Sequence, residues 1–197
     1  PPMTSSIFST YSTGENRVTA SLLAVLRSLS LDRIERLLGA MLEQSEFQLV
    51  QFQNQPAKGG TVPDAMILSS CRLLVETKTE RNQVKATQIQ GHLKQLEDGK
   101  ESTQALLVLT PDETVPKAIS TIDDERIAWS TFSALDQAID ELLADGREVI
   151  SDREAFLLRE LQTMLLNEGL TGSKKGVLVV PARKAWREYL NYHAYVC

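Results

Sequence analysis

The sequence predicts a fold of the α/β (α+β) class, in which helices flank a central mixed β-sheet. Short, almost entirely apolar runs at 65–68, 73–75 and 106–109 are typical of strands that are buried on both faces. Segments whose apolar residues recur every three or four positions surround these runs and predict amphipathic helices. With 197 residues, the chain is long enough for one ordinary hydrophobic core.

Two helices are expected before the first strand. Ser12 and Glu15 have the spacing of a capping box, and apolar residues at helical spacing follow as far as Leu29. A second amphipathic pattern begins at Leu31. A strand is then expected over 47–53, where apolar residues alternate loosely with glutamines.

A β-hairpin is expected next, formed by residues 59–68 and 71–78 with its turn at residues 69 and 70. Both of its strands are apolar on both faces, which predicts that helices cover the sheet on both sides.

Polar side chains gather at one end of this hairpin. Because side chains alternate across a strand, Glu76 and Lys78 share one face and Thr77 points the other way. Asp64 is brought to the same end by the hairpin. Two acids and a lysine are costly to bury without a partner, and a divalent cation is a partner that suits them.

The rest of the chain alternates helix and strand. A helix with a buried stripe of Ala86, Ile89, Leu93 and Leu96 follows the hairpin. The later elements expected are a buried strand at 104–110 in the centre of the sheet, a short helix opening at 111–113, an edge strand at 126–130, a helix over 132–143 and a long helix from Ser151.

Three regions are expected along the chain. Residues 1–11 are expected to be disordered or derived from a tag, and 12–168 to form the main domain. Residues 169–197 are expected to be a linker and a basic, aromatic segment leading toward a further domain. That segment either stacks on bases and grips phosphates or docks as an amphipathic helix on the domain.

Composition excludes several classes of protein. The formal charge is -5, no apolar run approaches the length of a membrane span, and the start lacks the regions of a secretory signal, so a cytoplasmic location is expected. Two cysteines cannot form a disulfide framework. Zinc-site spacing, a nucleophile elbow, a P-loop and a dinucleotide fingerprint are all missing from the sequence.

Pro63-Asp64, eleven intervening residues and Glu76-Thr77-Lys78 resemble the signature of the PD-(D/E)XK nuclease superfamily, which includes restriction endonucleases, Holliday-junction resolvases and RecB-type exonuclease domains. The resemblance implies a restriction-endonuclease-like core. It also implies phosphodiester hydrolysis that depends on Mg²⁺, with Mn²⁺ as a substitute, and favours DNA as substrate. Phage defence, restriction or repair would be the setting, with a homodimer or a partner subunit expected and no membrane partner.

The same resemblance implies roles for individual residues. Asp64 and Glu76 would hold the metal with the backbone carbonyl of Thr77, and Lys78 would orient water or stabilise the phosphate charge. Glu15 either caps its helix or resembles the acidic residue that many superfamily members carry on the first helix, where it reaches the metal.

A second motif lies on the following helix. Gln88 occupies the position of the glutamine in the third motif of RecB-type nucleases, where it lies near metal and phosphate. His92 stands where that motif has an aromatic residue, which departs from the RecB-type pattern. Gln88 and His92 are one turn apart on one helix face. His92 therefore has either a role at the site or an ordinary surface position.

Residues that would contact the substrate are scattered along the chain. Each has an alternative interpretation as a solvated surface or connector residue. They are Asn16, Lys58, Arg81, His92, Lys174 and Lys175.

Two rival functions remain open. One is a nuclease-like module that binds nucleic acid or a regulatory ligand without cutting it, and the other is a structural interaction domain within a larger assembly. Metal-dependent turnover separates the nuclease from the binding module. Nucleic-acid affinity that falls steeply with salt separates both from a scaffold.

Overall fold

The computed structural model describes residues 6–10, 13–44, 47–54, 65–69, 71–97, 99–101, 103–146 and 149–172. A 3-10 helix η1 (Ile7–Thr10) comes first, and six α-helices and five strands follow it within these ranges. They are α1 (Gly14–Leu26), α2 (Leu31–Leu42), β1 (Val50–Asn54), β2 (Ala65–Ser69), β3 (Cys71–Thr77), α3 (Ala86–Glu97), β4 (Thr103–Thr110), α4 (Lys117–Ser120), β5 (Ile127–Thr131), α5 (Phe132–Ala144) and α6 (Asp152–Asn167).

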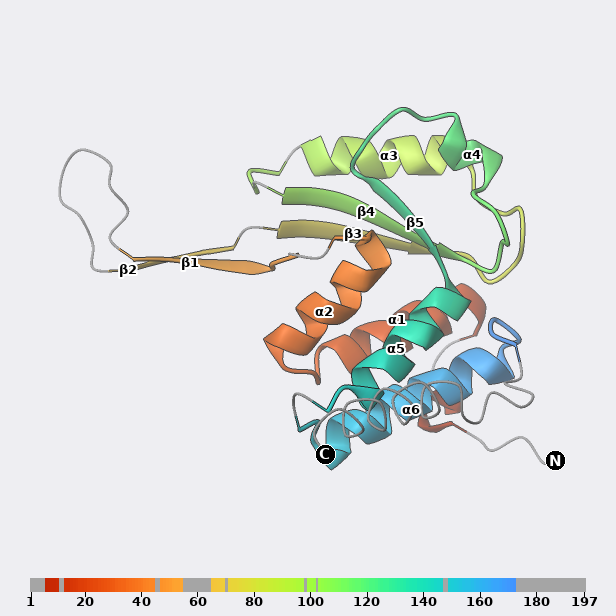
Figure 1. Cartoon of the computed structure of the whole chain (residues 1–197). Coiled ribbons are helices and arrows are strands. Elements are labelled where there is room, and N and C mark those ends of the chain that lie inside the picture. Colours follow the sequence, from red (N-terminus) through yellow and green to blue (C-terminus); the bar gives the residue numbers. More distant parts are fainter. Residues whose placement is uncertain are drawn as a thin grey trace, which may run out of the picture.

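The elements form three layers around the sheet of β3, β4 and β5. Figure 1 shows α3 and α4 on one face of this sheet and α1, α2, α5 and α6 on the other. The strands run in the order β3-β4-β5, and both pairings are parallel. The expected covering of the sheet on both faces is therefore confirmed, and so is the central place of the strand at 104–110.

Strand β4 shows why both faces are covered. Ala105, Leu107 and Leu109 pack into the core formed with α1, α2, α5 and α6. Leu106 and Val108 point the opposite way and pack with the apolar side of α3. Since alternate residues face opposite layers and all are apolar, the strand reads as a continuous hydrophobic run instead of an alternating one.

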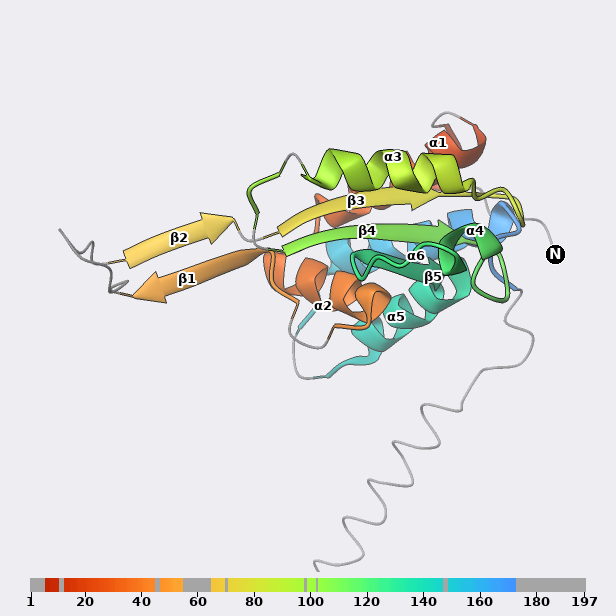
Figure 2. The same cartoon turned by 90° about the horizontal axis from the view of Figure 1, so that it is seen from above.

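The sheet differs from the mixed sheet that the sequence predicts. Strands β1 and β2 form a separate antiparallel pair, in which Val50 lies opposite Ser69 and Asn54 opposite Ala65. This pair extends away from the three layers, and β2 points in the same direction as β3 (Figure 2). The parallel sheet of β3, β4 and β5 is thus the one that the helices flank.

The predicted hairpin between 59–68 and 71–78 is wrong. Among the described residues, β2 pairs with β1, and β3 pairs with β4. One residue separates the end of β2 at Ser69 from the start of β3 at Cys71. Strands β2 and β3 point in the same direction (Figure 2), so no hairpin brings the start of β2 to the end of β3. The expectation that a hairpin places Asp64 beside Glu76 is therefore wrong, and Asp64 itself lies outside the described residues.

Two segments near the N-terminus also differ from the prediction. Within the stretch 1–11, expected to be disordered or derived from a tag, residues 7–10 form η1, and Phe8 is buried in the main core. Ser6 Oγ donates a hydrogen bond to the backbone oxygen of Glu160 on α6. The N-cap of α1 is Thr13 instead of Ser12, and it makes no side-chain capping bond.

The short helix after β4 begins later than predicted. Helix α4 starts at Lys117, after an N-cap at Pro116, and not at residues 111–113. Asp112 instead accepts a hydrogen bond from the backbone N–H of Asn82. The edge strand at 126–130 and the helix over 132–143 are confirmed, as β5 and α5.

The boundary at residue 169 does not coincide with the end of the core. Leu170 is buried in the main hydrophobic cluster, and Thr171 is buried beside it. The first residues of the expected linker are therefore part of the packed domain. Residues 173–197, including the basic and aromatic segment, lie outside the described ranges.

One further finding concerns membranes. In the part of the chain that the structure describes, no helix is both long and apolar enough to span a bilayer.

Glu154 connects the start of α6 to α2. It completes a capping box with Ser151, and its Oε1 accepts hydrogen bonds from the backbone N–H of Ser30 at 3.0 Å and from Arg33 at 2.9 Å. The hydrogen bond from the Ser151 hydroxyl, opposed by burial and helped by the backbone N–H groups and Arg33, lowers the pKa of Glu154 to about 2 from an ordinary value of 4.5. The charged carboxylate therefore stabilises the fold.

We predict that Glu154→Gln lowers the free energy of unfolding at pH 7 by about 2 kcal/mol, since it weakens several charge-assisted hydrogen bonds. A depressed carboxyl pKa contributes stability above pH 4.5, and this contribution is lost as pH falls from 4.5 toward 2. Urea unfolding at a series of pH values should show a flatter profile in that window for the variant than for the parent chain.

The exposed Glu125 supplies the matched control. Glu125→Gln should leave both the stability at pH 7 and the acid profile of the parent chain nearly unchanged. Parallel acid profiles for Glu154→Gln and the parent chain would contradict the prediction.

Candidate active site

The cluster of predicted site residues lies at the carboxyl end of β3. Glu76 and Thr77 are the last two residues of this strand, and Lys78 follows it directly. Among the described residues β3 pairs only with β4, so it is the outer strand of the parallel sheet. Helices from both layers can therefore reach its end, α1 from one side and α3 from the other (Figure 1).

Lys78 joins two carboxylates that are far apart in the sequence. Its Nζ lies 2.8 Å from Glu76 Oε1 and 3.1 Å from Glu15 Oε2. The side chain of Lys78 is 10% exposed and that of Glu76 is 13% exposed. The contact confirms that Glu76 and Lys78 share one side of the strand end.

Two opposing effects act on the charge of Lys78. Burial is the largest and acts to lower the pKa of the ammonium, but hydrogen bonds and charge attraction from Glu76 and Glu15 together outweigh it and raise the pKa. Lys78 is therefore a fixed positive charge at neutral pH. It neutralises part of the negative charge that the two carboxylates bring to the site.

Helix α3 holds the same Glu76 from the other side. Gln88 Nε2 donates to Glu76 Oε1 at 2.6 Å, and His92 Nε2 lies 3.0 Å from Glu76 Oε2. Ile89 and Leu93, both buried, anchor the helix on the sheet. The prediction that Gln88 and His92 share a helix face is confirmed, since both contact Glu76.

Thr77 faces the opposite layer, as the strand alternation predicts. Its hydroxyl lies 2.7 Å from the hydroxyl of Thr19 on α1. Thr19 also donates to the backbone oxygen of Glu15, one turn earlier. The Thr19–Thr77 bond therefore fixes α1 against the strand end and brings Glu15 within reach of Lys78.

Sequence reasoning did not identify Thr19. A threonine four residues after a glutamate on a helix is common, and only the contact with Thr77 distinguishes it. Glu15 accepts a hydrogen bond from Lys78, and its side chain remains 44% exposed.

Some predicted substrate contacts lie apart from this cluster. Asn16 is exposed on α1. Arg81, in the loop after Lys78, is exposed and forms an ion pair with Glu113 at 2.9 Å. The loop itself is held by Asp112, whose Oδ1 accepts from the backbone N–H of Asn82 at 2.9 Å. Asp64, Lys58, Lys174 and Lys175 lie outside the described residues.

The cluster also has the donor chemistry for a metal ion. Glu15 and Glu76 already face one shared cation, the ammonium of Lys78, so their carboxylates are arranged around a positive charge. Mg²⁺ is usually bound by one or two carboxylates together with water and substrate phosphates, and this oxygen set fits it. Within the described ranges, which leave out Asp64, no group of three His, Cys, Asp or Glu side chains could hold a metal.

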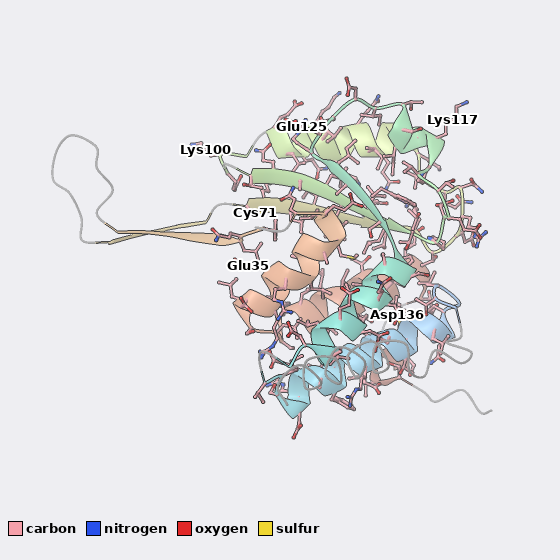
Figure 3. All side chains as sticks on the ribbon, in the orientation of Figure 1. Glu35, Cys71, Lys100, Lys117, Glu125 and Asp136 are labelled. Atoms are coloured by element: carbon pink, nitrogen blue, oxygen red, sulfur yellow. The ribbon has the colours of Figure 1, made fainter. Side chains whose placement is uncertain are left out.

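A large surface hollow lies elsewhere. It has a volume of about 930 Å³ and is lined by residues of α2, of the segment after α2 and of α5, among them Glu35, Arg36 and Leu142. Of these, Glu35 is labelled in Figure 3. None of its lining residues belongs to the cluster around Glu76. Chemistry, and not pocket size, therefore locates the candidate site.

Comparison with known proteins does not assign the chain to a family. No family model, no curated protein and no solved structure matches the chain. The functional interpretation therefore depends on the contacts around Glu76 and on the motif in which Glu76 lies.

Proposed function

We propose that this chain is a metal-dependent nuclease that hydrolyses phosphodiester bonds, with DNA as the favoured substrate. The observation that carries the proposal is the convergence on Glu76 of Lys78 from its own strand and of Gln88 and His92 from α3. An ordinary surface ion pair is exposed to solvent, whereas the Glu76 side chain is 13% exposed and has three partners. Perturbed, clustered charges of this kind are typical of catalytic sites.

The metal would be held by oxygen atoms of three residues. They are Glu76 and Glu15 through their carboxylates and Thr77 through its backbone carbonyl. A bound Mg²⁺ ion, or Mn²⁺ in its place, supplies an activated water at neutral pH and neutralises charge that develops on the phosphate.

Lys78 acts on the phosphate as a positive charge. In this role Lys78 is an electrostatic stabiliser of the charge that develops on the phosphate. An ammonium group has three N–H donors, and within the described residues Glu76 and Glu15 accept two of them. The remaining donor is suited to a phosphate oxygen.

Gln88 and His92 act on Glu76. Their contacts with its two oxygens restrict the rotation of the carboxylate, so that it keeps one orientation relative to Lys78. A catalytic group held by side chains of a packed helix is positioned more precisely than one on a loop.

The acidic net charge is compatible with a nucleic-acid substrate. Phosphate contacts need a local basic surface and not an excess of positive charge over the whole chain. We propose Lys58, Arg81, Lys174 and Lys175 as contributors to such a surface. A role in phage defence, restriction or repair follows from the same proposal, with a second copy or a partner subunit completing the assembly.

We predict that the chain cleaves labelled single-stranded or double-stranded DNA with Mg²⁺ or Mn²⁺ and not with EDTA. Glu76→Gln should reduce the rate at least about 100-fold, because it removes a carboxylate that would hold the metal. Gel-based cleavage assays at matched protein concentration measure this.

Glu125→Gln is the matched control for Glu76→Gln. Glu125, labelled in Figure 3, precedes β5 and so lies at the amino ends of the parallel strands, whereas Lys78 follows the carboxyl end of β3. Cleavage should be unaffected by this change. DNA binding without metal-dependent cleavage by the purified chain would contradict the nuclease and favour a module that binds nucleic acid without cutting it.

We also predict that Lys78→Met lowers the rate of cleavage at least about 100-fold while the variant binds metal no more weakly than the parent chain. The variant loses a positive charge that stabilises the phosphate, but it also loses a cation that competes for Glu15 and Glu76. Single-turnover kinetics and calorimetric titration with Mn²⁺ measure the two effects separately.

Lys100→Met is the control for this prediction. Lys100, labelled in Figure 3, is exposed and precedes β4. It therefore lies at the amino ends of the parallel strands, whereas Lys78 follows the carboxyl end of β3. Its replacement should change neither the rate nor the metal affinity. Weaker metal binding by Lys78→Met would overturn the assigned role of Lys78.

A further inference from the structure

A smaller hollow lies at the carboxyl ends of β4 and β5. Its volume is about 500 Å³, which is typical of pockets for small ligands. Asp112, which follows β4, lines this hollow together with Thr131 and Ser133 at the start of α5. Ligands of parallel α/β sheets usually bind outside the carboxyl ends of the strands, so the position suits a binding site.

One carboxyl oxygen of Asp112 has no partner. The residue is 8% exposed. Its Oδ1 accepts a hydrogen bond from the backbone N–H of Asn82 at 2.9 Å, whereas its Oδ2 is buried and accepts none from the described residues. A buried acceptor without a donor is costly. A hydrogen-bond donor on a ligand in the hollow would offset this cost.

A donor group suits this position better than a metal ion does. Glu113 is the neighbouring acid in the lining of the hollow, and its side chain is 76% exposed and pairs with Arg81. Across the ranges that the structure describes, no group of three His, Cys, Asp or Glu side chains could hold an ion. Asp112 therefore needs a ligand that carries an N–H or O–H group.

The same hollow has groups that attract an anion. The first turn of α5, capped by Thr131, lines it, and the N-terminus of a helix favours negative charge. Arg81 also lines it, and a phosphate can replace its exposed partner Glu113 at little cost. A nucleotide combines the two features that this lining favours, since it has a phosphate and a base with N–H donors.

The loop after β3 connects this hollow to the site around Glu76. The backbone N–H of Lys78 donates to the backbone oxygen of Leu109 at 2.9 Å. Further along the same loop, Asn82 donates to Asp112. The loop thus runs from the proposed phosphate-binding residue Lys78 to the hollow, beside the end of β4.

We propose that this hollow binds an unpaired nucleotide of the substrate strand, and that Asp112 Oδ2 accepts a hydrogen bond from the exocyclic amino group of a cytosine base. Carboxylates recognise the N4 amino group of cytosine in this way. The inference deepens the proposed nuclease function and rests on it, because it names a part of the substrate that would be read beside the same site.

The test compares two short single-stranded DNA probes, one made of cytosine nucleotides and one of uracil nucleotides. The bases are of similar size, but cytosine has an amino group at position 4 where uracil has a carbonyl oxygen. Fluorescence anisotropy in EDTA measures binding without cleavage. The parent chain should bind the cytosine probe at least about tenfold more tightly, since only this probe offers the amino donor to the charged acceptor.

Asp112→Asn reverses the hydrogen-bonding chemistry at one atom. The amide oxygen of the variant can still accept from the backbone N–H of Asn82, which leaves an NH₂ donor in the place of Oδ2. The variant should therefore bind the uracil probe more tightly than the cytosine probe. Asp123, exposed and before β5, gives the matched control, and Asp123→Asn should keep the preference for cytosine.

Arg81→Met tests the phosphate side of the hollow. It should weaken binding of both probes by about the same factor and reduce the salt dependence of the affinity, because phosphate contacts do not read the base. Thermal unfolding of each variant checks that the fold is retained.

Equal affinity of the parent chain for the two probes would overturn the inference, whatever the variants do. A cytosine preference that persists in Asp112→Asn would overturn it as well. Metal-dependent cleavage without any base preference would leave the nuclease standing and remove the nucleotide site. A base preference that Asp112→Asn reverses, in a chain that does not cleave, would contradict the nuclease and support the nucleotide site.

Discussion

The burial of β4 from Ala105 to Thr110 is the constraint on which the rest of the structure depends. This strand lies between β3 and β5 and contributes side chains to both hydrophobic layers, with Leu106 and Val108 on one face and Leu107 and Leu109 on the other. Burial of apolar surface supplies most of the stabilisation of such a core. Because both neighbours are parallel to β4, the carboxyl ends of all three strands lie at the same end of the sheet. Polar groups that follow the strands gather there.

The site follows from the outer position of β3 in that sheet. An inner strand would have neighbours on both sides, but the end of β3 is open to α1 and α3 at once. Glu15 therefore reaches Lys78 from one layer while Gln88 and His92 reach Glu76 from the other. Burying these charges is costly, and the cost is offset because each carboxylate has a cation or a hydrogen-bond donor beside it.

The end of β3 fixes both the charged groups of the site and helix α1. The hydroxyl pair of Thr19 and Thr77 holds α1 against β3 at the point where Glu15 and Lys78 meet. Contacts through one strand end thus connect the two layers, which share no helix and pack separate hydrophobic clusters. A change at this junction affects both the packing of α1 and the orientation of the charged groups.

The apolar stripe of α3 and the buried run of β4 could be predicted from the sequence, because hydrophobic periodicity depends on local geometry alone. The side on which Glu76 and Lys78 lie could be predicted for the same reason. The partner of β2 could not be predicted, because the apolar run at 65–68 suits a strand beside β3 as well as one beside β1, where the structure has it. Strand pairing joins segments that are separate in the sequence, and local apolar patterns do not specify it.

The sequence by itself determined which residues are apolar, which strands are buried on both faces and which charged residues form a recognisable motif. The tertiary structure alone decided that Glu15, Gln88 and His92 meet around Glu76 and Lys78, and that Thr19 belongs with them. The physical reason is that these contacts join side chains up to 63 positions apart. Such contacts depend on the order and direction of strands and on the docking of helices, which short-range patterns do not encode.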